Sequence, residues 1–81
     1  MAEIRALLID DDGRIAELLK TFLGQNGVAV EHRSDGHSGL RLLETPSLDV
    51  ALLDVMMPGI AGLEVCRRIR SHGGRVPIIM L

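Results

Sequence analysis

Acidic side chains follow two short apolar runs in this 81-residue chain, and their chemistry is the most informative feature of the sequence. Asp10 and Asp11 follow the run Ile4–Ile9, and Asp54 ends a run that begins at Val50. If both runs are buried parallel strands, their carboxyl ends lie side by side at one edge of a sheet. Two carboxylates about 6 Å apart repel by about 3 kcal/mol at an effective dielectric constant of about 20, so one of them should take up a proton unless a cation is bound. The pattern therefore suits Mg²⁺, which prefers hard oxygen ligands, together with a phosphoryl group.

The rest of the pattern supplies the elements that must position these acids. Asp12 can cap a helix, which Asn26 and Gly27 can end, and the next strand carries charged side chains typical of a sheet edge. The apolar residues at helical spacing in that first helix are Ile15, Leu18, Leu19, Phe22 and Leu23. The expected strands cover residues 4–9, a segment beginning at 28, residues 50–54 and residues 76–81. The later helices are a segment with Leu40, Leu42 and Leu43 that ends before Pro46, and residues 62–71, with Leu63, Cys66 and Ile69 on one side.

Strands that alternate with helices in this way predict a single α/β domain that spans residues 1–81. Its sheet is expected to be parallel, with right-handed crossovers and with helices on both faces. In such sheets ligands gather at the carboxyl ends of the strands, which is where Asp10, Asp11 and Asp54 are expected.

Composition narrows the class of function. The net charge of −2 gives no electrostatic case for binding nucleic acid or an anionic membrane. No apolar stretch approaches the roughly 18 residues of a membrane span, and the single cysteine, Cys66, fits a reducing compartment, so we expect a cytoplasmic protein without membrane contact. The histidines lack metal-ligand spacing and are given no role; they are His32, His37 and His72. Cations near a helix C-terminus are favourable, which explains the basic end of the third helix: Arg67, Arg68, Arg70 and Arg75.

Three motifs together resemble the receiver domain of bacterial two-component response regulators. They are Leu-Leu-Ile-Asp10-Asp11-Asp12, Leu-Leu-Asp54-Val-Met-Met-Pro58-Gly59 and Gly62-Leu-Glu-Val-Cys-Arg-Arg. The resemblance runs over all 81 residues. It implies a flavodoxin-like doubly wound parallel sheet with the strand order 2-1-3-4, here with four strands and three helices.

The resemblance also implies roles for single residues. Asp54 matches the phosphoacceptor, which takes a phosphoryl group from a phosphorylated histidine of a sensor histidine kinase. Asp11 matches a direct ligand of Mg²⁺ and Asp10 a ligand that acts through a water, while Asp54 and the backbone carbonyl of Met56 complete the metal site. Pro58 and Gly59 form the turn that marks the family.

The family has features that lie beyond these residues. A Ser or Thr follows its fourth strand and a Lys ends its fifth, whereas this chain ends at Leu81 and its one lysine, Lys20, lies mid-helix. We therefore expect a truncated receiver, the N-terminal two-thirds of the domain, which lacks the output surface and is impaired in signalling. The motifs are most similar to those of receivers fused to winged-helix DNA-binding domains, so transcription control and DNA contact are expected only through a domain absent from this chain. The fourth strand is expected to leave an apolar edge through which chains self-associate.

Other functions remain as alternatives at this point. A receiver is not an enzyme; at most it phosphorylates itself from small phosphodonors and slowly loses the phosphoryl group. A haloacid-dehalogenase-like phosphohydrolase with Asp10 as nucleophile matches Asp10-Asp11-Asp12-Gly13, but Arg14 and Asp54 depart from its pattern. A calcium loop fails because no Glu closes the 12-residue pattern. A third reading is a fragment whose only property is assembly.

Overall fold

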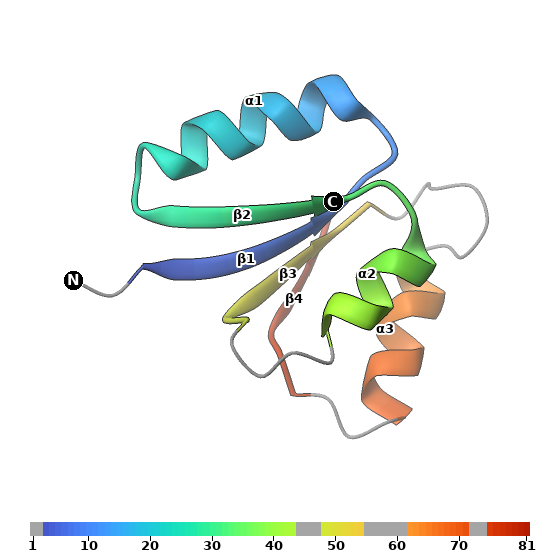
Figure 1. Ribbon diagram of the computed structural model, residues 1–81. Coiled ribbons are helices and arrows are strands. Elements are labelled where there is room, and N and C mark those ends of the chain that lie inside the picture. The colour runs from blue at the N-terminus through green and yellow to red at the C-terminus, as the bar shows by residue number, and fades with distance from the viewer. Residues whose placement is uncertain (1–2, 44–47, 55–61, 72–74) are drawn as a thin grey trace.

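The computed structural model describes residues 3–43, 48–54, 62–71 and 75–81, which form strands and helices in strict alternation (Figure 1). The elements are β1 (Ile4–Ile9), α1 (Gly13–Gly24), β2 (Val28–Arg33), α2 (Gly36–Leu43), β3 (Val50–Leu53), α3 (Gly62–Ser71) and β4 (Ile78–Met80). The predicted α/β alternation is thereby confirmed. β3 and β4 are shorter than predicted, and Asp54 follows β3 instead of belonging to it.

The four strands form one parallel sheet in the order β2-β1-β3-β4, as the family resemblance implied. In the central pair, Ile9 of β1 stands opposite Leu53 of β3, so both strands end at the same level. Hydrogen bonds continue past the ends of β4, since the Ala51 N–H donates to the Pro77 carbonyl (2.9 Å) and the Leu81 N–H to the Leu53 carbonyl (2.7 Å). The last segment is therefore held to β3 over more residues than the strand proper.

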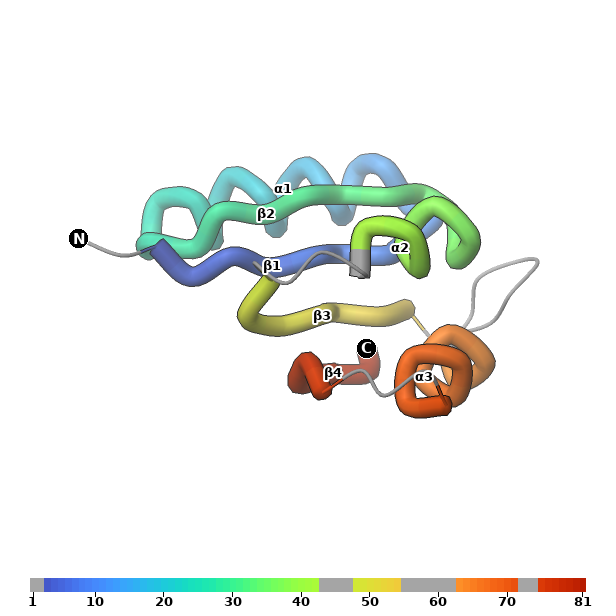
Figure 2. Tube along the Cα trace, turned by 60° about the horizontal axis from the view of Figure 1, so that its bottom comes forward, coloured from blue at the N-terminus to red at the C-terminus, as the bar shows by residue number. Residues whose placement is uncertain are grey.

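Helices cover both faces of the sheet, with α1 on one side and α2 and α3 on the other (Figure 2). Side chains alternate along β1 to serve both layers. Ala6 and Leu8 pack with Ala16 of α1, while Leu7 and Ile9 pack with Val65 of α3. All of these side chains are almost fully buried. The doubly wound architecture thus follows from a central strand that is apolar on both faces.

The helices present only part of their predicted apolar stripes to the core, together with Ala16 and Val65, which the pattern did not single out. In α1 the buried residue is Ala16, and Ile15, Leu18 and Phe22 are exposed by 47%, 72% and 61%. The apolar stripe of α1 is wider than the part of the helix that contacts the sheet. Only the side of the stripe that carries Leu19 and Leu23 packs inward. In α3 the buried residues are Val65 and Ile69, whereas Leu63 is exposed. Of the three residues expected on one side of this helix, Ile69 is buried and Cys66 packs against the core, but Leu63 does not.

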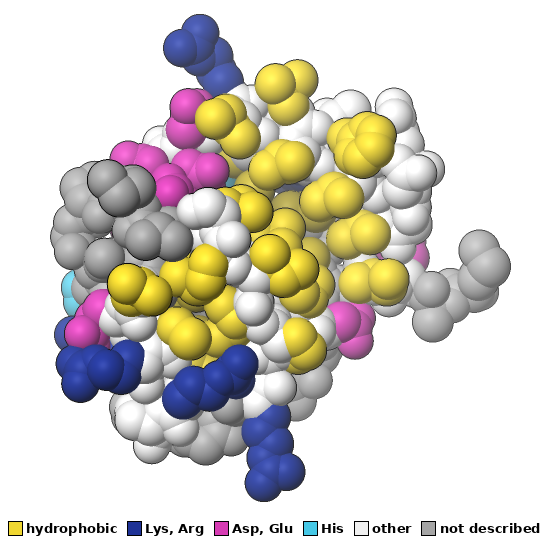
Figure 3. Space-filling model, turned by 180° about the vertical axis from the view of Figure 1, so that it is seen from behind, with side chains coloured by type: hydrophobic (Ala, Val, Ile, Leu, Met, Phe, Trp, Pro, Cys, Tyr) yellow, Lys and Arg dark blue, Asp and Glu magenta, His cyan; other side chains and the backbone are white. Residues whose placement is uncertain are grey.

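Apart from Leu63 on α3, uncovered apolar side chains gather on the face that carries α1 and the back of the sheet (Figure 3). Ile79 of β4 stands opposite Leu52 on this face and is 52% exposed, and Leu81 is 54% exposed. β4 is the last strand of the sheet, and among the described residues its only strand neighbour is β3. The expected apolar edge strand is present.

Candidate functional site

Pairing between the two central strands brings their following acids together. The Asp54 N–H donates to the Ile9 carbonyl (2.9 Å), which extends the β1–β3 ladder by one residue. The Asp10 N–H donates to the Arg33 carbonyl of β2 (3.1 Å), which anchors Asp10 on the other side. The backbone of both residues is therefore fixed by the sheet itself, at its carboxyl edge.

Asp10, Asp11 and Asp54 form an acidic cluster in which one carboxylate oxygen from each residue lies within 4.8 Å of the others. Asp10 is buried, Asp54 is half-buried and Asp11 is exposed. Three hard oxygen donors with one open side are the kind of ligand set that Mg²⁺ uses, since this ion usually keeps several waters. The three acids that the sequence singled out are thus brought together.

Asp12, the next acid along the chain, is directed elsewhere. One of its carboxylate oxygens accepts hydrogen bonds from the N–H groups of Arg14 (3.0 Å) and Ile15 (3.3 Å). These are unpaired donors of the first turn of α1, so Asp12 is the N-cap of that helix. Its predicted capping role is confirmed.

Burial raises the pKa of Asp10 above its ordinary value, and the negative charges of Asp54 and Asp11 act in the same direction. The Asp12 N–H, which donates to Asp10 Oδ1 (2.8 Å), opposes this shift in pKa because it stabilises the charged form. The metal-free cluster therefore binds a proton more readily than an isolated carboxyl group. A divalent cation at these oxygens relieves the same repulsion, so the residues fit the ion that the sequence predicted.

A further residue contacts the cluster that the sequence did not indicate. The Nε2 atom of His32 lies 2.8 Å from the backbone carbonyl oxygen of Asp10, and because a carbonyl only accepts, the ring nitrogen carries the hydrogen. His32 stands opposite Leu8 in the β1–β2 register, so its ring lies near the point where β1 ends. A single histidine in an edge strand has no motif; only knowledge of this register could have revealed the contact.

Asp11 is the exposed member of the cluster and lies beside the start of α1. A shallow, open depression of the surface there is lined by Asp11, Asp12, Gly13 and Arg14. The single lysine, Lys20, is exposed further along α1 and is not part of the cluster. The remaining predicted site residues, Met56, Pro58 and Gly59, lie outside the described residues.

Comparisons with known proteins agree with this arrangement. The family model described as "Response regulator receiver domain" matches residues 6–81. The chain is 45% identical over 78 residues to the response regulator MprA of Mycolicibacterium vanbaalenii, and 44% identical over 78 residues to the MprA of Mycobacterium ulcerans. In both cases the match covers 96% of this chain and 34% of the relative, so the chain spans about a third of the length of these curated relatives.

Solved structures give the same result for the fold. The receiver domain of the Francisella response regulator 1452 superimposes with a TM-score of 0.91 at 32% identity, covering 96% of this chain and 64% of the other. A chain in the structure of histidine kinase ThkA in complex with response regulator protein TrrA superimposes with a TM-score of 0.87 at 36% identity, covering 95% and 66%. In the part of the chain that the structure describes, no helix has the length and apolar character needed to cross a membrane.

Proposed function

Because this chain belongs to the response regulator receiver domain family, we propose that Asp54 accepts a phosphoryl group from a phosphorylated histidine of a sensor histidine kinase. The observation that carries the proposal is the clustering of one oxygen each from Asp10, Asp11 and Asp54 within 4.8 Å. Of these acids, Asp54 is half-buried and Asp10 is buried, so Asp54 is the more accessible of the two that follow strands.

The reaction needs a carboxylate nucleophile and little else from the protein. An oxygen of Asp54 attacks the phosphorus, a P–O bond forms and the P–N bond to the imidazole breaks, with its electron pair left on the imidazole nitrogen. The product is an acyl phosphate on Asp54. Asp10, Asp11 and Asp54 would hold Mg²⁺, together with the Met56 carbonyl that the family resemblance implies. Bound there, the ion supplies positive charge that offsets the charge of the transferring phosphoryl group.

Phosphorylation of the 81-residue chain with acetyl phosphate and Mg²⁺ tests the assignment. We expect a mass increase of one phosphoryl group, and peptide mapping after borohydride reduction should place it on Asp54. Asp54→Asn should abolish the increase. Asp12→Asn is the matched control, because Asn caps helices as well as Asp does and the residue lies beside the cluster without belonging to it.

The other outcomes separate the alternatives. Modification of Asp10 would identify a phosphohydrolase of the haloacid-dehalogenase type. If neither acetyl phosphate nor a phosphorylated kinase modifies the chain, assembly alone remains. We expect a slow reaction in this polypeptide, because its one lysine, Lys20, lies on α1 away from the acids, and signalling by the polypeptide alone to be impaired accordingly.

The proposal extends to location and partners. A sensor kinase that phosphorylates Asp54 implies a cytoplasmic receiver, and one structural neighbour is titled as a complex of a histidine kinase with a response regulator. Control of transcription, and contact with DNA, would require a domain outside residues 1–81.

We also propose that the 81-residue chain self-associates through β4. Residues 76–81 carry no charged side chain, so no side chain of this edge strand repels a second copy. Ile79 and Leu81 are each more than half exposed on the same face as the exposed stripe of α1. A second copy that pairs with the edge would complete the hydrogen bonds of β4 and cover these side chains.

A further inference from the structure

The peptide group between Asp10 and Asp11 joins two acids of the cluster, and its orientation decides how both are aimed. A peptide group is planar, so fixing its carbonyl also fixes the N–H and the Cα atom of Asp11. The carboxylate of Asp10 is held separately by the Asp12 N–H at 2.8 Å. What holds the carbonyl therefore helps to position the first two acids relative to Asp54.

The group that holds this carbonyl is the ring of His32, through Nε2 at 2.8 Å. The N–H of Asp10 donates to the carbonyl of Arg33, which is the last residue of β2. Ile9 and Arg33 are the last paired residues of β1 and β2. The ring of His32 therefore supplies the donor for the next carbonyl of this chain segment, that of Asp10. His32 is half-buried, and its ring is anchored on a strand that is paired along its whole length.

We propose that His32 is a positioning residue of the divalent-cation site: its ring N–H holds the Asp10–Asp11 peptide so that both carboxylates face Asp54. The inference rests on the proposed function, since it assumes that the acidic cluster binds a hard divalent cation. Among the described residues, the other histidine, His37, makes no hydrogen bond with an acid of the cluster. Removal of partners that orient ligands typically lowers metal affinity by 10- to 100-fold.

Binding of Mn²⁺ alone, followed by the electron paramagnetic resonance of the free ion, tests this on the 81-residue protein. His32→Leu removes the donor and should weaken Mn²⁺ binding by about 10-fold. His32→Gln keeps an N–H donor at a similar reach and should stay within about 3-fold of the wild type. His37→Leu, at an exposed position in α2, is the matched control and should bind as the wild type does.

Urea unfolding in EDTA, monitored by circular dichroism, separates positioning from folding. A positioning role predicts that His32→Leu loses Mn²⁺ affinity while it unfolds cooperatively and His32→Gln regains the affinity. Equal Mn²⁺ affinities of His32→Leu and the wild type would overturn the inference. Absence of Mn²⁺ binding by the wild type would instead refute the proposed metal site.

A measurement on the wild type keeps the inference testable if His32→Leu does not fold. The ring nitrogens of ¹⁵N-labelled His32 report which one carries the hydrogen. The contact with Asp10 requires a protonated Nε2. A neutral ring with its hydrogen on Nδ1 would contradict the proposal.

Discussion

At the scale of single residues, Asp10 combines two opposed requirements. The sheet fixes its backbone and buries its side chain to 6% exposure, while its neighbours Asp11 and Asp54 are acids as well. Burial and these charges raise the pKa of Asp10, so the site is least stable when it is ionised and metal-free. A divalent cation bound to these carboxylates would remove this repulsion, which adds to the free energy of its binding.

The raised pKa of Asp10 predicts the sign of a substitution. A carboxyl group whose pKa is raised by folding stabilises the protein fully below its unfolded pKa of about 3.9, and the contribution is lost as the pH rises through the folded pKa. Asp10→Asn should therefore increase the free energy of unfolding at neutral pH in EDTA, by a few kcal/mol at most, and the gain should disappear near pH 3. The Asn Oδ1 can still accept the hydrogen bond from the Asp12 N–H.

Urea unfolding at several pH values measures the effect. Asp12→Asn is the control and should show no comparable gain, since Asp12 caps α1 outside the cluster. If Asp10→Asn is less stable than the wild type at neutral pH in EDTA, the charge of Asp10 does not destabilise the folded protein.

At the scale of elements, the sequence predicted the strands better than the faces of the helices. An apolar run in a strand buried on both faces leaves little choice, and β1 runs over Ile4–Ile9 as expected. A helix can pack on a sheet in different orientations about its own axis. Which of its sides faces the sheet depends on the area of the sheet that is available. This is why Ala16 is buried in α1 while Leu18 is exposed. The acids at the strand ends were predictable for the same reason as the strands, whereas the His32 contact depends on tertiary register.

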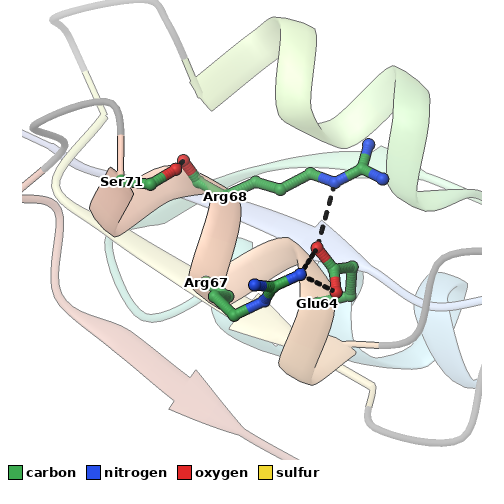
Figure 4. A network of polar contacts seen from close by, with 4 residues as sticks. All are labelled: Glu64, Arg67, Arg68 and Ser71. Atoms are coloured by element: carbon green, nitrogen blue, oxygen red, sulfur yellow. Dashed lines mark hydrogen bonds and ion pairs between the residues drawn. The ribbon is translucent and has the colours of Figure 1, made fainter.

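Two of the arginines in the second half of α3 have a partner within the same helix. Arg67 donates two hydrogen bonds to the carboxylate of Glu64 (2.8 and 2.9 Å), and Arg68 Nε donates a third (3.2 Å; Figure 4). These hydrogen bonds from Arg67 and Arg68 lower the pKa of Glu64 below its ordinary value. Two of the four arginines thus have a partner three or four residues away in the same helix. This pairing favours a structural role over contact with nucleic acid.

Helix α2 approaches β1 closely, and this predicts opposite effects for two identical substitutions. A Cβ atom at Gly39 would stand 2.6 Å from Cγ1 of the fully buried Ile9, and nearer still to its Cδ1. Gly39→Ala should therefore lower the free energy of unfolding by about 1–3 kcal/mol through overpacking, less the gain in helix propensity. Gly24→Ala has nothing within 4 Å and should instead raise it by about 0.4–1 kcal/mol. Thermal unfolding of both variants measures the pair, and equal effects would contradict the close approach.

At the scale of the whole molecule, the two layers are unequal. The α2–α3 layer covers a core that reaches across β1 and β3 and contacts Ile78 and Met80 of β4. On the opposite face, the residues around Ala16 of α1 cover β2, β1 and β3, and the part of this core that the structure describes includes no residue of β4. The face in Figure 3 therefore carries many exposed apolar side chains, and its charged side chains lie mostly toward the edges of the view. Such a patch, next to an edge strand without charged side chains, favours contact between copies.

Two substitutions of apolar residues that are each more than half exposed test that contact. Ile79→Lys places a charge on the edge strand, and Leu63→Lys places the same charge on α3 in the other layer; the two side chains are 52% and 65% exposed. Light scattering should show a mass that rises above that of one chain with concentration for the wild type and for Leu63→Lys. Ile79→Lys should weaken association by at least about tenfold, or about 1.4 kcal/mol, because the charge must be buried when the edge pairs. A wild type that stays monomeric at every concentration would refute self-association, and equal behaviour of the two variants would move the contact away from β4.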